Sequence, residues 1–216
     1  MTTVPSHDCP YHTRIVQPEI GPNYKPGGIM VVGEAPGYHE DRLGRPFVGD
    51  SGRYLDALLE SVGISRADCY ITNIVSCRPP NNKLTAAGVK LHTPFFGAQL
   101  AGARPGLVVA VGATALAYFD SSLTLTAAHG KHIKHDPYTL VPVFHPAYAM
   151  RNPKIWPILQ ADFASLLVEP APPVSADYTL GQVDVSPGTI IGFDVETTDQ
   201  KVNGVFYPHL QHVLGY

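Results

Sequence analysis

Residues 29–37 read IMVVGEAPG, a short apolar run that ends in glycine and leads into a loop of Glu, Ala, Pro and Gly. Similar apolar runs follow at 70–75, 107–111 and 140–144, each closed by a glycine, proline or polar break. Short runs rich in β-branched residues between such breaks are typical of buried strands. The sequence therefore predicts four strands.

Helical patterns lie between these runs. After Ser51, a plausible N-cap, apolar residues recur at helical spacing as far as Val62, and further helices are expected at 94–103, 113–119 and 154–168. Strands that alternate with helices favour a mostly parallel sheet covered on both faces. We expect a three-layer α/β/α sandwich around a mostly parallel four-stranded sheet.

The composition limits the classes of protein that fit. The 216 residues are 44% apolar and carry a formal net charge of -3, so there is no overall basic surface for nucleic acid. Three cysteines do not make a disulfide framework, and neither a signal peptide nor a membrane-spanning run of ~20 apolar residues is present. These features favour a cytoplasmic protein without a membrane partner.

A proline-rich stretch, EPAPPV at 169–174, is typical of a linker. We expect one domain at 1–169, the linker at 170–188, and the start of a second domain at 189–216.

Unusual polar sequences follow three of the four predicted strands, at the sheet edge where ligands bind in open α/β folds. Asn73 could read an amide edge, Phe47 could stack on a flat ring, and His145 could stabilise a developing anion. Each alone would more often serve a turn or the core. Their shared placement favours a ligand site, while the end after 107–111, Gly112-Ala113-Thr114, is predicted to be only a tight turn.

Three strings carry a resemblance to a known family: GEAPGYHEDRLGRPFVG at 33–49, YITNIVSCRPPNNK at 70–83 and FHPAYAMRNP at 144–153. They resemble the motifs of family 4 uracil-DNA glycosylases, the iron–sulfur type, over roughly residues 9–168. The resemblance implies hydrolysis of the N-glycosidic bond of uracil in DNA, as in base excision repair. No lysine matches a Schiff-base position, so we expect no lyase activity.

The resemblance also implies roles for the residues that would contact the base. The backbone around Ala35 and Gly37 would line the uracil pocket, and Glu40 would lie near uracil C5 and reject the thymine methyl. Phe47 would stack on the flipped base, and Asn73 would read its edge.

The catalytic positions are His145, near the uracil O2 side, and Glu34. The best-known uracil glycosylases have a water-activating aspartate where this chain has Ala35, and family 4 also lacks it. Glu34 is the nearest carboxylate and is therefore only a candidate base.

The loop at 147–151 resembles the segment that enters the duplex, with Tyr148, Met150 and Arg151 as candidate contacts. Cations beside the motifs could bind phosphates despite the net charge, although any one of them is more simply explained as solvated surface. They are Arg42, Arg45, Arg78, Lys83, Arg151 and Lys154.

A metal site is implied by the same resemblance, because family 4 holds a [4Fe–4S] cluster with four cysteines. The matching positions here are Cys9, His12, Cys77 and His92, so histidine replaces cysteine twice. The ligand set would suit an iron–sulfur cluster or zinc, and the absence of any metal stays an alternative. Cys69 is expected in the core.

Three further histidines, His129, His132 and His135, are predicted to lie in a solvated loop.

The segment at 190–198, IIGFDVETT, resembles the first motif of DEDD-type 3′–5′ exonucleases. The resemblance implies that Asp194 and Glu196 are part of a metal set that would bind catalytic Mg²⁺ only in a complete exonuclease domain. A surface strand with alternating acids is the alternative. We expect the chain to be the front of a longer protein similar to phage DNA polymerases that carry a glycosylase-like domain before the exonuclease.

Two functions remain open: an active uracil glycosylase, and a non-catalytic module that reads uracil or positions DNA for a replicative polymerase. The intact residues Asn73, Phe47 and His145 favour the enzyme.

Overall fold

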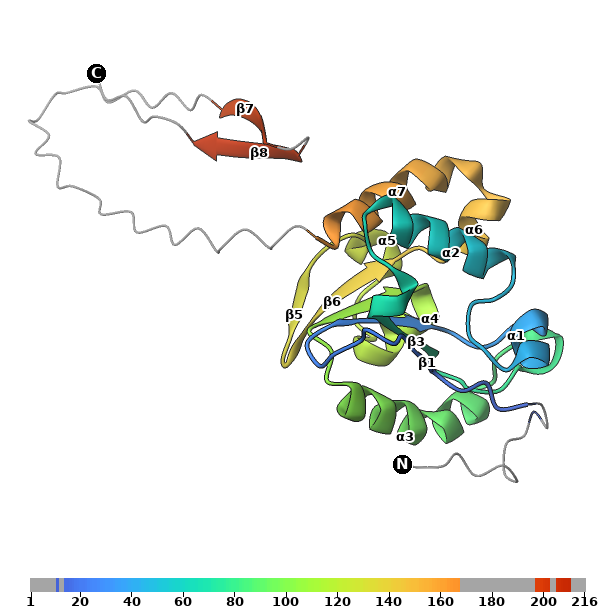
Figure 1. Ribbon diagram of the computed structural model, residues 1–216. Helices are drawn as coiled ribbons and strands as arrows, with labels where there is room; N and C mark the ends of the chain where they lie inside the picture. The colour runs from blue at the N-terminus through green and yellow to red at the C-terminus, as the bar shows by residue number, and fades with distance from the viewer. Residues whose placement is uncertain (1–10, 12–13, 168–196, 203–204, 211–216) are drawn as a thin grey trace, which may run out of the picture. The chain divides into compact units, whose positions relative to one another are not determined.

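The computed structural model describes Tyr11, residues 14–167, and two short segments at 197–202 and 205–210 (Figure 1). The chain divides into two compact units, Met1–Ala171 and Pro172–Tyr216.

The first unit is built on a six-stranded sheet with the strand order β1-β3-β2-β4-β6-β5. The four predicted strands form its parallel centre, but the predicted number of strands was wrong because short antiparallel strands are added at both edges. Their bounds are β1 Glu19–Ile20, β2 Ile29–Gly33, β3 Cys69–Asn73, β4 Leu107–Val111, β5 Ile133–His135 and β6 Tyr138–Val143.

Helices cover both faces of this sheet, as the alternation of strands and helices predicted. They are α1 Tyr38–Leu43, α2 Asp50–Ser61, α3 Ala86–Ala103, α4 Ala113–Phe119, α5 Leu125–Ala128, α6 Pro146–Arg151 and α7 Trp156–Ser165. Three short 3-10 helices accompany them at Arg66–Asp68, Pro80–Asn82 and Pro153–Ile155.

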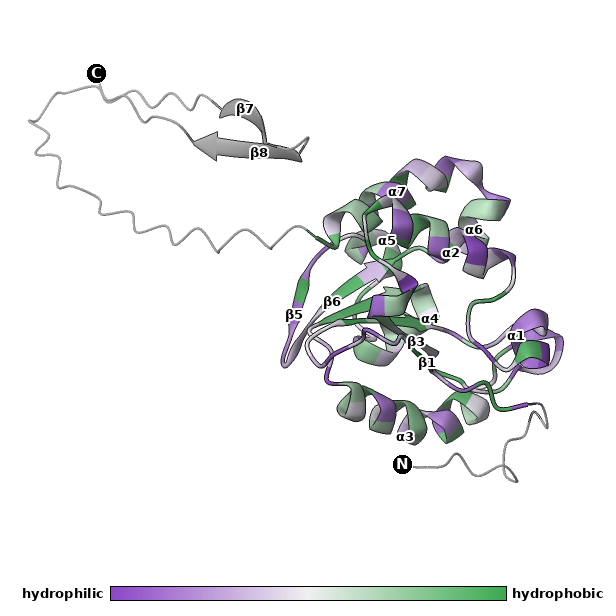
Figure 2. Ribbon diagram, in the orientation of Figure 1, coloured by the Kyte–Doolittle hydropathy of each residue, from purple (hydrophilic) through white to green (hydrophobic). Residues whose placement is uncertain are grey.

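Successive side chains of a strand point to opposite faces, so each central strand serves two cores. In β2, Met30 packs in one core with Phe96 of α3, whereas Val31 packs in the other core with Leu58 of α2 and Phe163 of α7. Figure 1 shows α3 on one side of the sheet and α2 and α7 on the other, and the central strands are strongly apolar in Figure 2. The three-layer α/β/α prediction is confirmed.

Three predicted helix starts were displaced. The helix that covers 94–103 begins at Ala86, where the Thr85 hydroxyl caps it by accepting a hydrogen bond from the Gly88 N–H at 3.1 Å, and it continues through Pro94. The N-cap of α2 is Gly49 rather than Ser51. The last helix begins at 156 because a 3-10 turn occupies the preceding three residues.

The prediction of a solvated loop for the histidines after α5 was wrong in its solvation: His129 and His132 lie in the connection to β5 but are partly buried, and His135 lies in the β5–β6 hairpin. The His129 Nδ1 lies 2.9 Å from the Asp162 Oδ1, and the His132 Nε2 lies 2.8 Å from the Ser165 carbonyl oxygen. His135 stacks on a neighbouring tyrosine ring within β5 and β6. His129 and His132 therefore connect the segment before β5 to α7, and His135 packs β5 against β6. Cys69 is fully buried, as predicted.

The second unit shows two antiparallel strands, β7 Thr197–Val202 and β8 Val205–Leu210. The predicted linker at 170–188, the apolar run at 189–193, and the motif residues Asp194 and Glu196 lie outside the described residues. Among the helices of the described part, none combines the length and apolar character that crossing a bilayer requires.

Candidate active site

The ends of β2 and β3 bring the first two predicted site residues together. Gly33 and Asn73 are register partners on these parallel strands, and Asn73 is only 6% exposed. A methyl group placed on Gly33 would lie 2.4 Å from the Asn73 Oδ1 and 2.5 Å from the Phe47 Cζ. Only glycine lets the amide and the ring pack so closely over the end of β2.

Phe47 reaches this point from the loop between α1 and α2. Its backbone is left-handed, with φ of +50°, and its side chain is buried. The ring lies 6.0 Å from the His145 ring, centroid to centroid, at an interplanar angle of 24°. The predicted residues Phe47, Asn73 and His145 therefore gather at one edge of the sheet, although they come from three separate segments.

His145 follows β6 and is the N-cap of α6, where its Nδ1 accepts a hydrogen bond from the Ala147 N–H at 3.1 Å. Because Nδ1 is the acceptor, the neutral ring carries its proton on Nε2. Burial, reinforced by the nearby Arg151 and partly opposed by Glu40, lowers the pKa of His145 to about 4. At neutral pH the side chain is an uncharged donor.

The end of β4 supports this histidine. Gly112 makes the predicted tight turn, with φ of +95°, and its N–H donates to the Val143 carbonyl at 2.9 Å. A methyl group on Gly112 would lie 3.4 Å from the His145 Cβ. The turn therefore brings the β4–α4 connection against the imidazole.

Glu34 extends toward that same connection. Its Oε2 accepts a hydrogen bond from the Thr114 hydroxyl in the first turn of α4. Thr114 was treated as part of a turn in the sequence, and nothing local indicated that it orients a carboxylate. Ala35 packs against one core, and Gly37 is the N-cap of α1.

Glu40 is buried, and its carboxylate is surrounded by backbone donors. The N–H groups of Gly37, Val48 and Gly49 donate to it at 3.1, 2.9 and 2.7 Å. The carboxylate thus joins the loop before α1 to the loop before α2. Its expected action against a thymine methyl stays a prediction.

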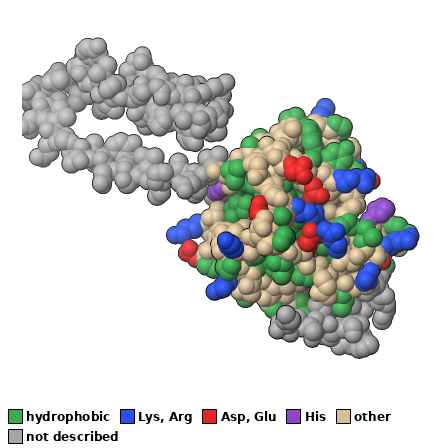
Figure 3. Space-filling view, viewed as in Figure 1, with side chains coloured by type: hydrophobic (Ala, Val, Ile, Leu, Met, Phe, Trp, Pro, Cys, Tyr) green, Lys and Arg blue, Asp and Glu red, His purple; other side chains and the backbone are tan. Residues whose placement is uncertain are grey.

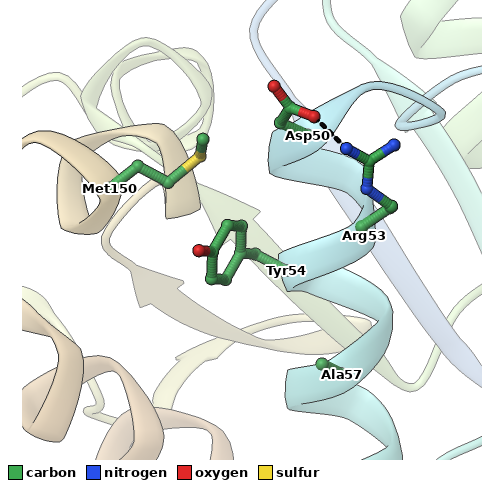
Figure 4. Close-up of a pocket in the computed structure, with 5 residues that line it drawn as sticks. All are labelled: Asp50, Arg53, Tyr54, Ala57 and Met150. Carbon is green, nitrogen blue, oxygen red and sulfur yellow. Dashed lines mark hydrogen bonds and ion pairs between the residues drawn. The ribbon is translucent and has the colours of Figure 1, made fainter.

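The segment expected to enter DNA is a short helix, α6, and not a loop as predicted. Tyr148 and Met150 are 41% and 42% exposed, and Arg151 is also exposed. Met150 borders a hollow of about 470 Å³ between α6 and α2, with Tyr54 facing it (Figure 4). This hollow flanks α6 and is separate from the residues that gather at the strand ends.

Three of the six cations that were predicted to bind phosphates already contact other side chains of the protein. Arg42 and Arg78 lie over the ring of the exposed Tyr38, at 5.6 and 5.3 Å from its centroid, whereas Arg45 is paired with Glu19 at 3.0 Å. On the face shown in Figure 3, basic side chains are interspersed with acidic ones.

Two of the four predicted metal ligands fall within the described residues. Cys77 and His92 are both fully buried, and the Ser76 N–H donates to the His92 Nδ1 at 3.4 Å, so the two segments adjoin. Burial lowers the pKa of His92 and favours the neutral imidazole that a metal requires. Cys9 and His12 lie outside the described residues, and the described part alone holds no group of three potential metal ligands.

One residue that contacts the site was missed altogether. Arg66 lies just before β3, and its guanidinium donates to the backbone of the Phe47 loop. It lies four residues before the motif at 70–83 and outside all three motifs, so only the folded structure links it to Phe47.

Comparison with known proteins agrees with this geometry. Residues 22–165 match the model of the uracil DNA glycosylase superfamily. A type-4 uracil-DNA glycosylase of Thermotoga maritima is 40% identical over 148 residues, covering 67% of this chain and 77% of that protein. Another from Sulfurisphaera tokodaii is 34% identical over 174 residues, covering 74% and 79%. A DNA polymerase of Bacillus phage SP01 is 27% identical over 140 residues, covering 64% of this chain and 15% of the polymerase. The chain therefore belongs to the uracil DNA glycosylase superfamily.

Proposed function

We propose that this protein hydrolyses the N-glycosidic bond of uracil in DNA and leaves an abasic site. The observation that carries the proposal is the convergence of Phe47, Asn73 and a neutral His145 at one sheet edge. The similarity to type-4 uracil-DNA glycosylases supports the same activity.

The base would be recognised by two contacts. The Phe47 ring offers a face for stacking, and the Asn73 amide can donate and accept at once, which matches the edge of uracil. Both side chains are buried, so a base within a duplex cannot reach them. The nucleotide must be extruded or already single-stranded.

The chemical step would depend on His145. Cleavage leaves negative charge on uracil and positive charge on the sugar, so a fixed donor near the uracil O2 stabilises the transition state more than the ground state. The Ala147 N–H holds Nδ1, and the Nε2–H is the donor that remains. One such donor contributes ~3–4 kcal/mol.

Glu34 is our candidate for orienting the attacking water. The Thr114 hydroxyl fixes one carboxylate oxygen and leaves the other to accept from water. This arrangement offers a carboxylate close to the position where Ala35 replaces the aspartate of other uracil glycosylases.

The proposal includes a metal centre with four ligands: Cys77 and His92, which lie within the described residues, and Cys9 and His12, which lie outside them. A [4Fe–4S] cluster would fit the type-4 resemblance, and zinc is the alternative for a set of two cysteines and two histidines. His92 could bind either metal only by giving up the long contact with the Ser76 N–H, because that contact keeps the ring proton on Nε2. When bound, the centre would hold the segment after β3 against α3.

We also propose that the chain is continuous with exonuclease and polymerase domains, since the phage DNA polymerase is similar over 140 residues. Asp194 and Glu196 would then contribute to an exonuclease site for Mg²⁺ that needs further acidic residues.

The test is a single-turnover excision assay on single- and double-stranded DNA that contains uracil. His145→Ala should excise at least ~10²-fold more slowly, by analogy with the loss of an oxyanion donor, while its affinity for uracil-DNA changes little. Wild-type excision by the variant would refute the assigned role. Tight binding of uracil-DNA by a wild-type protein that never releases uracil would favour the reader module instead.

A further inference from the structure

The position of the Phe47 ring depends on an unusual backbone. Phe47 adopts φ of +50°, a left-handed conformation that the Cβ of any residue other than glycine makes unfavourable. Such a conformation persists only where surrounding contacts hold it. Contacts around the Phe47 loop must therefore hold this backbone conformation, and with it the position of the ring.

One guanidinium holds two consecutive carbonyl groups of this loop. The Arg66 Nη2 donates to the Pro46 carbonyl oxygen at 2.7 Å, and the Arg66 Nη1 donates to the Phe47 carbonyl oxygen at 3.1 Å. Because the guanidinium is rigid and planar, bonds to these two carbonyls fix the orientations of the two peptide groups on either side of the Phe47 Cα.

The guanidinium is itself fixed from the opposite side. Glu19 accepts from its Nε at 3.0 Å and its Nη2 at 2.8 Å, and Asp56 of α2 accepts from its Nη1 at 2.8 Å. The Arg66 side chain is only 19% exposed. Its hydrogen bonds to Glu19, together with those of Arg45, lower the pKa of Glu19 to about 2 although burial opposes the shift. The cluster joins an edge strand, α2 and the Phe47 loop through one charged group.

The first turn of α2 closes the remaining side of the loop. A methyl group on Gly52 would lie 2.0 Å from the Phe47 carbonyl oxygen. The Phe47 carbonyl oxygen therefore lies between the first turn of α2 and the Arg66 guanidinium, which donates a hydrogen bond to it.

We propose that Arg66 is a positioning residue, which fixes the left-handed Phe47 backbone and so holds the ring in place for uracil to stack on it. The inference rests on the proposed function, because it assigns Phe47 the stacking role. Arg66 opens the 3-10 helix that directly precedes β3, and β3 ends at Asn73, so one segment positions both the stacking ring and the amide that reads the base.

The test is a double-mutant cycle between Arg66→Gln and Phe47→Ala, measured by single-turnover excision and by affinity for a uracil-containing single-stranded oligonucleotide. Arg66→Gln should lower both quantities, and the rate by about ten- to a hundredfold, since small misplacements in a site cost that much. In the Phe47→Ala background it should cause no further loss. Equal losses in both backgrounds would overturn the proposal, as would a wild-type rate and affinity in the single variant.

Two more variants separate positioning from stability. Arg66→Lys keeps the charge beside Glu19 and Asp56 but cannot span both carbonyls, so it should fold, should not restore the rate, and can replace Arg66→Gln in the cycle. Asn23→Ala removes a hydrogen bond to Asp68 in the same 3-10 helix, away from Phe47, and should leave both readouts unchanged. Restoration by Arg66→Lys, or an equal loss in Asn23→Ala, would show that Arg66 acts only on general stability.

The proposed function can fail separately. If the wild type binds uracil-DNA but does not excise, the glycosylase assignment falls, and the cycle on affinity still decides the role of Arg66. If the wild type shows no preference for uracil, both proposals fall.

Discussion

Protonation of His145 should destabilise the fold, because the structure holds this side chain neutral. The unfolded histidine titrates at 6.5, and burial lowers the folded pKa to about 4. Below pH 6.5 the unfolded chain gains a proton that the folded protein does not bind, so stability is complete above that pH and is lost as pH falls toward 4. Linkage gives a loss of about 2 kcal/mol between pH 7.5 and pH 5 from this group alone.

The assay is urea denaturation of the wild type and of His145→Gln at both pH values. Other groups titrate in both proteins, so the comparison concerns the difference in the change of unfolding free energy. The wild type should lose about 2 kcal/mol more than the variant, and an NMR titration of the ring should give a midpoint well below 6.5. Equal losses in the two proteins, or an ordinary midpoint, would refute the neutral-donor argument.

Two other predictions follow from the packing and from the candidate metal site. Gly33→Ala should lose excision and about 1–3 kcal/mol of stability, because the new methyl would overlap the Phe47 ring; Gly102→Ala, with nothing within 4 Å, is the control, and an active, stable Gly33→Ala would contradict the packing. Anaerobically purified protein should contain iron or zinc, measured by elemental analysis, which Cys77→Ala should lose; a folded, active wild type without either metal would remove the site.

The centre of the fold was predictable because its strands are short, apolar and separated by clear breaks. The edge strands were not, since Glu19–Ile20 and Ile133–His135 are too short to show alternation. The start of α3 was missed because Pro94 suggested a boundary, whereas the helix tolerates this proline in its interior. Local sequence patterns thus predicted the central strands, but they did not predict the edge strands or the start of α3, which depend on tertiary packing.

The candidate site divides in the same way. Asn73 ends one apolar strand and His145 lies just after another, so their meeting at one edge could be expected from parallel topology alone. The protonated nitrogen of His145 could not, since it depends on a backbone contact at 3.1 Å within α6. Arg66 has no signal in its own neighbourhood, because its function in the fold arises from carbonyls some twenty residues earlier.

The two carboxylates near this edge raise an electrostatic question, because negative charge would develop on the departing uracil. Hydrogen-bond donors within the protein stabilise both carboxylates. Glu40 accepts hydrogen bonds from three backbone N–H groups, and Glu34 accepts one from the Thr114 hydroxyl. These bonds stabilise the negative charge of each carboxylate within the protein. The Nε2–H of His145, by contrast, is not used by the contact that holds the ring. Within the described residues, the site thus combines hydrogen-bonded acceptors with a donor that is still free to bind a ligand, as the stabilisation of an anionic leaving group requires.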